Sequence, residues 1–254
     1  MCRVPQTFSE RNEGIIRTVA LMRHLASIVG VKNAYQFAKW FDGKQNTFNR
    51  ASTAASGKWS RNFSGQVSLK GEQLDLLERL IPDARRFYEQ GPADLWTALW
   101  SDPVNLWPLC RTRYCDDGPE IDDRIWTVIK DELKNERTLD TVIAEFEANL
   151  LLAQHYGEPL TIRHLSEGIA LFRLYHHINA LTRINADGAG LYQSIVACLA
   201  DINVCHKLNE IVGFDRIQSA IYGVIQNLEI PLERIDSKSR WEVLGDRLAW
   251  VSER

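Results

Sequence analysis

The sequence predicts an all-helical fold. Apolar residues recur at helical spacing along most of the chain, and the alternation of apolar and polar residues that marks a strand is rare. Glycine and proline are sparse, with 15 and 8 among 254 residues, and several of them follow the apolar segments that they end. We therefore expect a basic N-terminal helical module followed by a C-terminal antiparallel helical bundle.

The N-terminal module is predicted to begin with two helices and a loop. Residues 14–30 place apolar side chains on one helical stripe, and Gly30 is a stop signal at its end. Asn33 is a typical N-cap for a second, shorter helix over residues 33–42. Residues 43–57 are polar and bounded by glycines, so we interpret them as a loop.

The same module is predicted to end with a short helical turn and an amphipathic helix. Residues 58–64, with the sequence KWSRNFS, form the turn, which ends at Gly65. Ser68 then caps a helix over residues 69–81, whose leucines face inward, and Pro82 ends that helix.

A proline-rich and tryptophan-rich stretch, residues 91–120, is predicted to be a packed connector between a module over 1–90 and a bundle over 121–254. Its Trp96, Trp100 and Trp107 recur too closely among leucines to be left in water. The candidate helices of the bundle are residues 121–135, 138–156, 161–183, 187–209, 214–227 and 239–252. The third and fourth of these are strongly apolar and joined by a short turn, which predicts an antiparallel hairpin.

The net charge is uneven along the chain. Residues 11–70 contain ten Lys and Arg against Glu13 and Asp42, a net charge of +8, so the other 194 residues carry −11 of the total of −3. A basic segment within an acidic protein indicates an anionic partner at one end, and nucleic acid is the commonest such partner. The acidic bundle is expected to bind a protein partner or a second copy of the chain.

Residues 34–82 combine a short helix, a polar loop, Trp59, Gly65 and a Leu-x-x-Leu-x-x-Leu helix formed by Leu74, Leu77 and Leu80. This order resembles the helix-turn-helix domain of the Cro/repressor family, although about fifteen polar residues separate the two helices where the family has a few. The resemblance implies that certain polar side chains point at DNA, where Arg suits guanine and Asn and Gln suit adenine. These side chains are Lys58, Ser60, Arg61, Asn62 and Gln66.

The polar loop adds further residue types that order on a phosphate backbone. The full set of predicted nucleic-acid contacts is Lys44, Arg50, Lys58, Ser60, Arg61, Asn62, Gln66 and Lys70. Two alternatives stay open at this point. The turn over residues 58–64 is equally consistent with an exposed polar helix whose Trp59 and Phe63 face the core, and the loop with a solvated excursion that has no role.

Other chemistry receives less support from the sequence. Cys110 and Cys115 form one loose pair, and structural zinc sites usually need two, so we expect free cysteines, no metal and no cofactor. Arg17 and His24 fit the loose R-x(4–6)-H pattern and so resemble the helical HEPN ribonucleases, but Thr18 stands where that family typically has Asn or Asp.

The function expected is that of a non-catalytic DNA-binding regulator or DNA-contacting subunit, with duplex DNA as its partner. The N-terminus is polar and no apolar run reaches the roughly 18–20 residues that span a bilayer, so we expect a cytoplasmic protein without a membrane partner. The alternative is a helical interaction subunit of a larger bacterial-type assembly, such as a defence or toxin–antitoxin complex, without direct DNA contact. A third hypothesis is a small HEPN-like ribonuclease.

Overall fold

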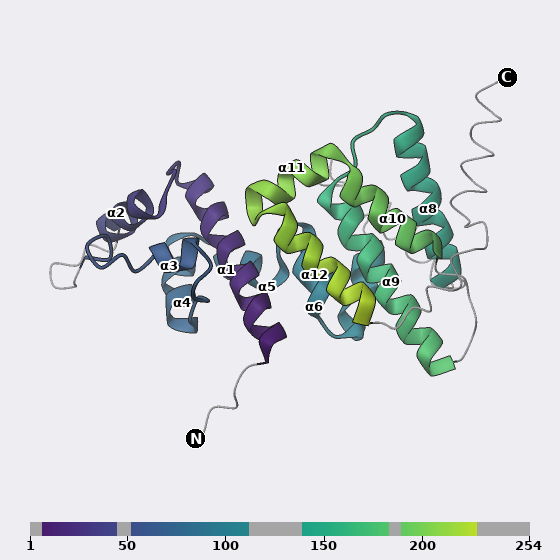
Figure 1. The fold of residues 1–254 in the computed structure, drawn as a ribbon, viewed down its shortest axis with the longest axis horizontal. Coiled ribbons are helices and arrows are strands. Elements are labelled where there is room, and N and C mark those ends of the chain that lie inside the picture. The colour runs from purple at the N-terminus through teal and green to yellow at the C-terminus, as the bar shows by residue number, and fades with distance from the viewer. Residues whose placement is uncertain (1–6, 45–51, 112–138, 183–188, 228–254) are drawn as a thin grey trace, which may run out of the picture. The chain divides into compact units, whose positions relative to one another are not determined.

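Helices are the only regular elements in the part of the chain that the structure describes (Figure 1). The structure is a computed structural model that describes residues 7–44, 52–111, 139–182 and 189–227. The predicted all-α fold is confirmed for these residues. Among them, no helix is both long and apolar enough to cross a membrane.

The chain divides into two compact units. Unit 1 comprises Met1–Pro92 and His206–Ala220, and unit 2 comprises Ala93–Cys205 and Ile221–Arg254. This division differs from the expected one in two ways. The stretch predicted to be a separate connector belongs to unit 2 from Ala93 onward. Residues 206–220, which were expected in the C-terminal bundle, belong to unit 1.

Unit 1 is built from short helices around one long helix. Its helices are α1 (Phe8–Ile28), α2 (Ala34–Lys44), α3 (Ser60–Phe63), α4 (Gly71–Leu80) and α5 (Ala84–Gln90), with adjoining parts of α11 (Ile202–Ile211) and α12 (Phe214–Asn227). Helix α1 begins earlier than predicted because Thr7 and Glu10 form a capping box. The Glu10 N–H donates to Thr7 Oγ1 at 3.2 Å, and the Thr7 N–H donates to Glu10 Oε2 at 2.8 Å.

One predicted cap in this unit is confirmed and another is wrong. Asn33 caps α2, because its Oδ1 accepts a hydrogen bond from the Gln36 N–H at 2.9 Å. Ser68 does not cap α4. The helix begins at Gly71, and the N–H of Lys70 before it donates to Gln73 Oε1 at 3.0 Å. The residue that precedes the helix is therefore Lys70, two positions after the predicted cap Ser68.

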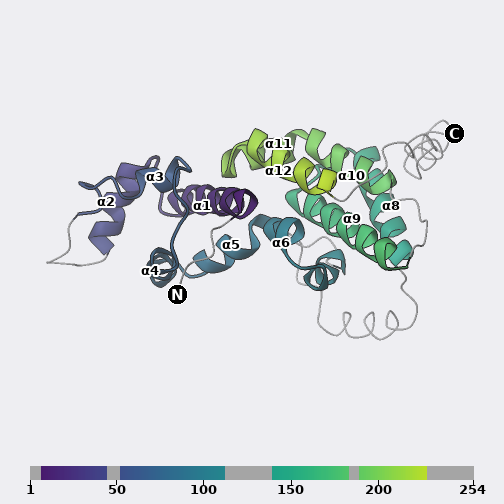
Figure 2. The same ribbon diagram turned by 60° about the horizontal axis from the view of Figure 1, so that its bottom comes forward.

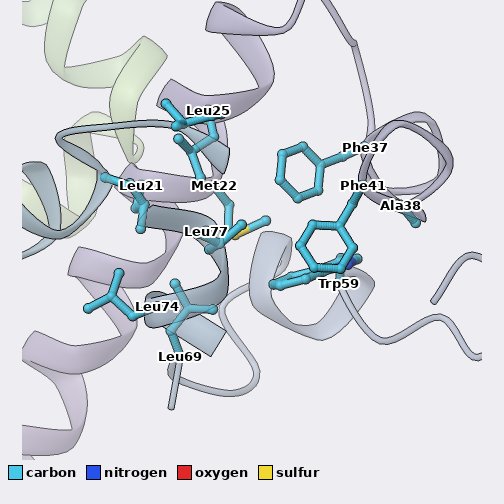
Figure 3. Packing of buried hydrophobic residues seen from close by; sticks show 12 residues of the cluster. Leu21, Met22, Leu25, Phe37, Ala38, Phe41, Trp59, Leu69, Leu74 and Leu77 are labelled. Carbon is cyan, nitrogen blue, oxygen red and sulfur yellow. The ribbon is translucent and has the colours of Figure 1, made fainter. Parts of the chain in front are cut away.

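The core of unit 1 is centred on three aromatic rings. Phe37 and Phe41 of α2 meet the edge of Trp59, with ring centroids 5.6 and 4.9 Å apart, and Trp59 is fully buried (Figure 3). Aliphatic side chains from α1 and α4 complete the cluster, namely Leu21, Met22, Leu25, Leu74 and Leu77. Because these three rings point inward, the charged side chains of α2 and α3, Asp42 apart, are exposed.

Unit 2 packs around α9. Its described helices are α6 (Leu95–Trp100), η2 (Pro103–Asn105), η3 (Trp107–Arg111), α8 (Leu139–His155), α9 (Ile162–Thr182) and α10 (Ala189–Ala200), with parts of α11 and α12. Helix α9 packs against α10, α8 and α6 (Figure 2). The Arg173 guanidinium of α9 donates to the carbonyls of Ala98 and Ser101, both at 2.7 Å, and so ties the end of α6 to α9.

The three tryptophans of the expected connector were predicted to be buried, and one of them is fully buried. Trp96 is fully buried and stacks on Trp100, with ring centroids 5.2 Å apart, while Trp100 and Trp107 are half-buried. A partly buried Arg163–Asp94 ion pair, 2.7 Å between Nη1 and Oδ2, fixes the residue that precedes α6. The described residues 93–111 of this stretch are thus an integral part of unit 2.

The predicted helix over residues 187–209 is wrong as a continuous element. It is interrupted at Asp201, whose carboxylate accepts hydrogen bonds from the N–H groups of Asn203 at 2.8 Å and Val204 at 3.3 Å. These bonds start a new helix, α11, because they satisfy N–H groups that have no partner in the first turn. The candidate helices over 121–135 and 239–252 lie outside the described residues.

Candidate nucleic-acid interface

Asp42 holds the chain where it returns from the polar loop. Its carboxylate accepts hydrogen bonds from the hydroxyl and N–H of Thr53, at 2.6 and 3.1 Å, from the Ser52 hydroxyl at 2.8 Å and from the Ala54 N–H at 3.1 Å. Burial alone raises the pKa of Asp42, but these hydrogen bonds favour the ionised form and hold its pKa below the ordinary value of 3.8. The described end of the loop is therefore anchored to α2.

Trp59, which directly precedes α3, is bonded to the same Thr53 side chain. Its Nε1–H donates to the Thr53 hydroxyl at 3.1 Å, so the indole is fixed at its polar edge as well as by the ring contacts. Gly65 ends the turn after α3 with φ +73°, and the N–H of Gln66 donates to the Arg61 carbonyl at 2.9 Å. The side chains on the outer side of α3 are thus presented from a rigid turn.

Most of the predicted nucleic-acid contacts lie on the surface of unit 1. The exposed residues are Lys44 at the end of α2, Lys58, Ser60 and Arg61 at α3, Gln66 after Gly65, and Lys70 before α4. Lys58 Nζ lies 5.6 Å from the centroid of the Trp59 ring. We call these six residues the basic surface. Arg50 lies outside the described residues.

The prediction for Asn62 is wrong. Its side chain is 2% exposed, and its Nδ2 donates a hydrogen bond to the Val67 carbonyl at 3.0 Å. A buried amide whose donor is used in this way is not available to a base edge. Asn62 instead closes the turn between α3 and α4, and it does so because α3 turns its Asn62 side toward the core along with Trp59.

Eight exposed cations of the segment 11–70 have no acidic ion-pair partner in the described part of the chain. Glu13 accepts a hydrogen bond from the Ser9 hydroxyl at 3.2 Å, and Asp42 is occupied by the loop. No ion pair with a described acidic residue forms at the exposed Arg11, Arg23, Lys32, Lys39, Lys44, Lys58, Arg61 or Lys70.

The neighbouring α4–α5 pair shows the opposite arrangement. Arg85 forms ion pairs with Asp75, with Glu78 at 2.9 Å and with Glu89 at 3.4 Å. Arg86 likewise lies 3.6 Å from Asp83. Acidic side chains on and beside α4 and α5 therefore neutralise local arginines, whereas the eight exposed cations named above face solvent.

Helix α3 is too short to act as a long recognition helix. Its four residues span about 6 Å, at about 1.5 Å per residue. Residues 45–59 separate it from α2, in keeping with the long connection noted in the sequence. This geometry favours contacts from the turn and the flanking lysines over deep insertion of a helix into a groove.

An exposed aromatic–lysine pair on α2 was not singled out in the sequence. Tyr35 is 57% exposed, and Lys39 Nζ lies 4.7 Å from the centroid of its ring. The four-residue spacing on a helix was the available signal, because residues at that spacing share a face. The pair adds a flat aromatic group beside a cation on the surface of unit 1.

His24, one member of the Arg17–His24 pair, packs against an aromatic ring of α5. The His24 ring stacks on Phe87, with centroids 3.9 Å apart and planes inclined by 4°, and burial lowers the pKa of His24. The described cysteines form no disulfide, and Cys110 and Cys198 are buried. Cys110 Sγ donates to the Leu106 carbonyl at 3.3 Å, and burial raises the pKa of Cys198 to about 12. Cys115 lies outside the described residues.

Comparison of the chain with protein-family models, with curated proteins and with solved structures found no match.

Proposed function

We propose that the basic surface of unit 1 binds duplex DNA, and that the protein is a non-catalytic, cytoplasmic DNA-binding regulator or DNA-contacting subunit. The observation that carries this proposal is the set of exposed cations in residues 11–70 that have no ion-pair partner among the described residues. Such cations are free to replace the counterions condensed on a phosphate backbone, which is the main source of affinity for DNA.

The residue types on the basic surface support two kinds of contact. Lys44, Lys58 and Lys70 are point charges suited to phosphates. Arg61 and Gln66 are hydrogen-bonding side chains suited to base edges as well. Their backbones are joined by the hydrogen bond from the Gln66 N–H to the Arg61 carbonyl, so a single rigid turn presents both. The order of elements in residues 34–82 resembles a helix-turn-helix domain, which favours duplex DNA over single strands. Because α3 has only four residues, the contacts come from the turn and its flanking lysines and not from an inserted helix.

The experiment is a binding titration of the full-length protein against labelled duplex DNA, single-stranded DNA and RNA at several salt concentrations. Log affinity for the duplex should fall linearly with log salt, with a slope of about −0.9 per phosphate contact. Lys70→Gln should weaken binding on all sequences and reduce that slope by about one contact. Arg86→Gln is the matched control, because it removes the same charge from a residue that is paired with Asp83.

Two results would change the proposal. Stronger binding to RNA or to single strands than to duplex would reassign the ligand. No affinity for any nucleic acid, even at low salt, would end the proposal. The basic surface would then be assigned to an acidic protein partner, as in the alternative of an interaction subunit within a larger assembly.

The second part of the proposal is that the helices of unit 2 bind a protein partner or a second copy of the chain. A dimer suits a DNA-binding regulator because operators are commonly two-fold symmetric. Light scattering coupled to size-exclusion chromatography tests this part alone, and a concentration-independent monomer would leave only the binding of another protein.

A further inference from the structure

Arg216 brings a cation from the C-terminal part of the chain to the turn that follows α3. Its Nη1 lies 2.8 Å from the position that a Cβ would occupy on Gly65, and the same position is 3.0 Å from Val19 Cγ2 of α1. Gly65 also has φ +73°, a conformation that side chains rarely adopt. A glycine at this turn therefore lets the guanidinium lie directly against the backbone next to Gln66.

Arg23 of α1 is a second cation near the Gly65 turn. It lies one helical turn beyond Val19 on the same face of α1, because residues four apart on a helix are neighbours. The Arg23 Nη1 donates to the carbonyls of Asn209 at 3.0 Å and Glu210 at 3.3 Å, at the C-terminal end of α11. These bonds stabilise the last turn of that helix and hold the guanidinium in place.

The two guanidinium groups repel one another. Burial and the positive charge of Arg216 both lower the pKa of Arg23. Glu210 does not compensate, because its carboxylate is directed to His206, with 3.5 Å between Oε1 and Nδ1. Among the described residues, neither arginine forms an ion pair with an acidic side chain.

We propose that Arg23 and Arg216, together with the Gly65 turn, form a phosphate-binding site that extends the basic surface and holds one backbone phosphate of the bound nucleic acid. Paired arginines suit this ligand, because guanidinium groups donate two parallel hydrogen bonds to phosphate oxygens. Arg23 is pre-oriented by the α11 carbonyls, so little side-chain freedom is lost when the phosphate binds. The inference rests on the proposed function, because it assigns a further contact to the same ligand.

The test compares Arg216→Gln with wild type in the duplex titration described above, using the full-length protein. Loss of one charge-assisted phosphate contact should weaken binding about tenfold at low salt and reduce the salt slope by about one. Arg86→Gln, with the same change of net charge, should leave both quantities close to wild type. Thermal unfolding of the free protein should show Arg216→Gln at least as stable as wild type, because the repulsion at Arg23 is removed.

The outcomes separate the two proposals. If Lys70→Gln weakens binding but Arg216→Gln has the affinity and slope of wild type, the phosphate site is wrong and the proposed function stands. If Arg216→Gln and Arg86→Gln weaken binding equally, the effect is one of net charge and the phosphate site is again wrong. If wild type binds no nucleic acid, both proposals fail together.

Discussion

The Thr53 hydroxyl donates a hydrogen bond to the Asp42 carboxylate at 2.6 Å while it accepts one from the Trp59 indole at 3.1 Å. One hydroxyl thus connects a charged group on α2 with the largest ring of the core. Because Thr53 bonds to both groups, the position of the chain at Thr53 is coupled to the core of unit 1.

We predict that Asp42→Asn destabilises the protein by about 1–2 kcal/mol at neutral pH, because an amide is a weaker acceptor than a carboxylate for these hydrogen bonds. The folded pKa of Asp42 lies below its unfolded value near 3.8. The stabilising contribution is therefore complete above about pH 4 and is lost as the pH falls through the folded pKa. Urea unfolding of both proteins between acid and neutral pH measures it.

The control for this change is Asp75→Asn, which removes an exposed ion-paired carboxylate on α4. An exposed pair contributes little, so this variant should remain within about 0.5 kcal/mol of wild type. A stability gap between wild type and Asp42→Asn that stays constant down to the lowest pH would contradict the assignment.

Replacing each of two buried tryptophans by Phe should change the free energy of unfolding by different amounts. Trp59→Phe keeps the ring contacts but leaves the Thr53 hydroxyl without its indole donor, and we expect a loss of about 1 kcal/mol. The Trp96 Nε1 is buried with no hydrogen-bond partner among the described residues, so Trp96→Phe deletes an unsatisfied group, which offsets part of the lost packing.

The measurement is chemical denaturation of both Phe variants beside the two Ala variants. Trp59→Ala and Trp96→Ala should each cost about 3–5 kcal/mol, because each removes a fully buried ring. A larger loss for Trp96→Phe than for Trp59→Phe would show that ring size, and not the indole donor, governs these two sites.

Arg61 and Asn62 are adjacent but should separate binding from stability. Asn62→Ala removes a buried hydrogen bond and should cost about 1–2 kcal/mol of unfolding free energy, with little effect on DNA affinity in the folded protein. Arg61→Gln should leave stability within about 0.5 kcal/mol and should weaken duplex binding, because Arg61 is exposed. Paired urea and DNA titrations decide this, and the reverse pattern would exclude Arg61 from the basic surface.

Glu167 on α9 should make unit 2 sensitive to pH. Burial raises the pKa of Glu167 to about 7, with Arg163 lowering it and Glu145 raising it further. The folded protein favours the protonated acid, so this contribution to stability is complete below the unfolded value near 4.5 and is lost as the pH rises through about 7. Glu167→Gln should therefore be more stable than wild type above pH 7, by roughly 1–2 kcal/mol.

Unfolding measured from pH 5 to pH 8 checks this prediction. The advantage of Glu167→Gln should shrink as the pH falls, because wild type then carries the neutral acid as well. Glu158→Gln is the control, since Glu158 is exposed. A pH-independent difference between Glu167→Gln and wild type would indicate a change in packing and not in ionisation.

Local signals in the sequence predicted the helices well where the deciding group is close in the chain. Asn33 caps α2 through a residue three positions later, and α12 has the predicted bounds. The interruption at Asp201 was missed because the apolar pattern continues through it. Helix α5 was not predicted because Pro82 was interpreted only as the end of the preceding helix, whereas a new helix begins at Ala84 after Asp83 turns the chain with φ +70°.

The candidate site was less accessible to sequence reasoning, because its geometry depends on distant residues. The charge of residues 11–70 indicated the segment, but the burial of Asn62 follows from the packing of α3 and not from its residue type. The approach of Arg216 to Gly65 joins parts of the chain that no local pattern connects. Residue type indicated which groups suit DNA, and the tertiary fold decides which of them are presented.

The return of residues 206–220 to unit 1 affects how this protein is made. Translation releases residues 1–92 first, but the segment that completes their unit follows only after residues 93–205 have been synthesised. The carbonyls of Asn209 and Glu210 that hold Arg23 are absent until then. A nascent N-terminal fragment therefore exposes the face of α1 that those residues cover, and this surface is completed only after residues 206–220 have been synthesised.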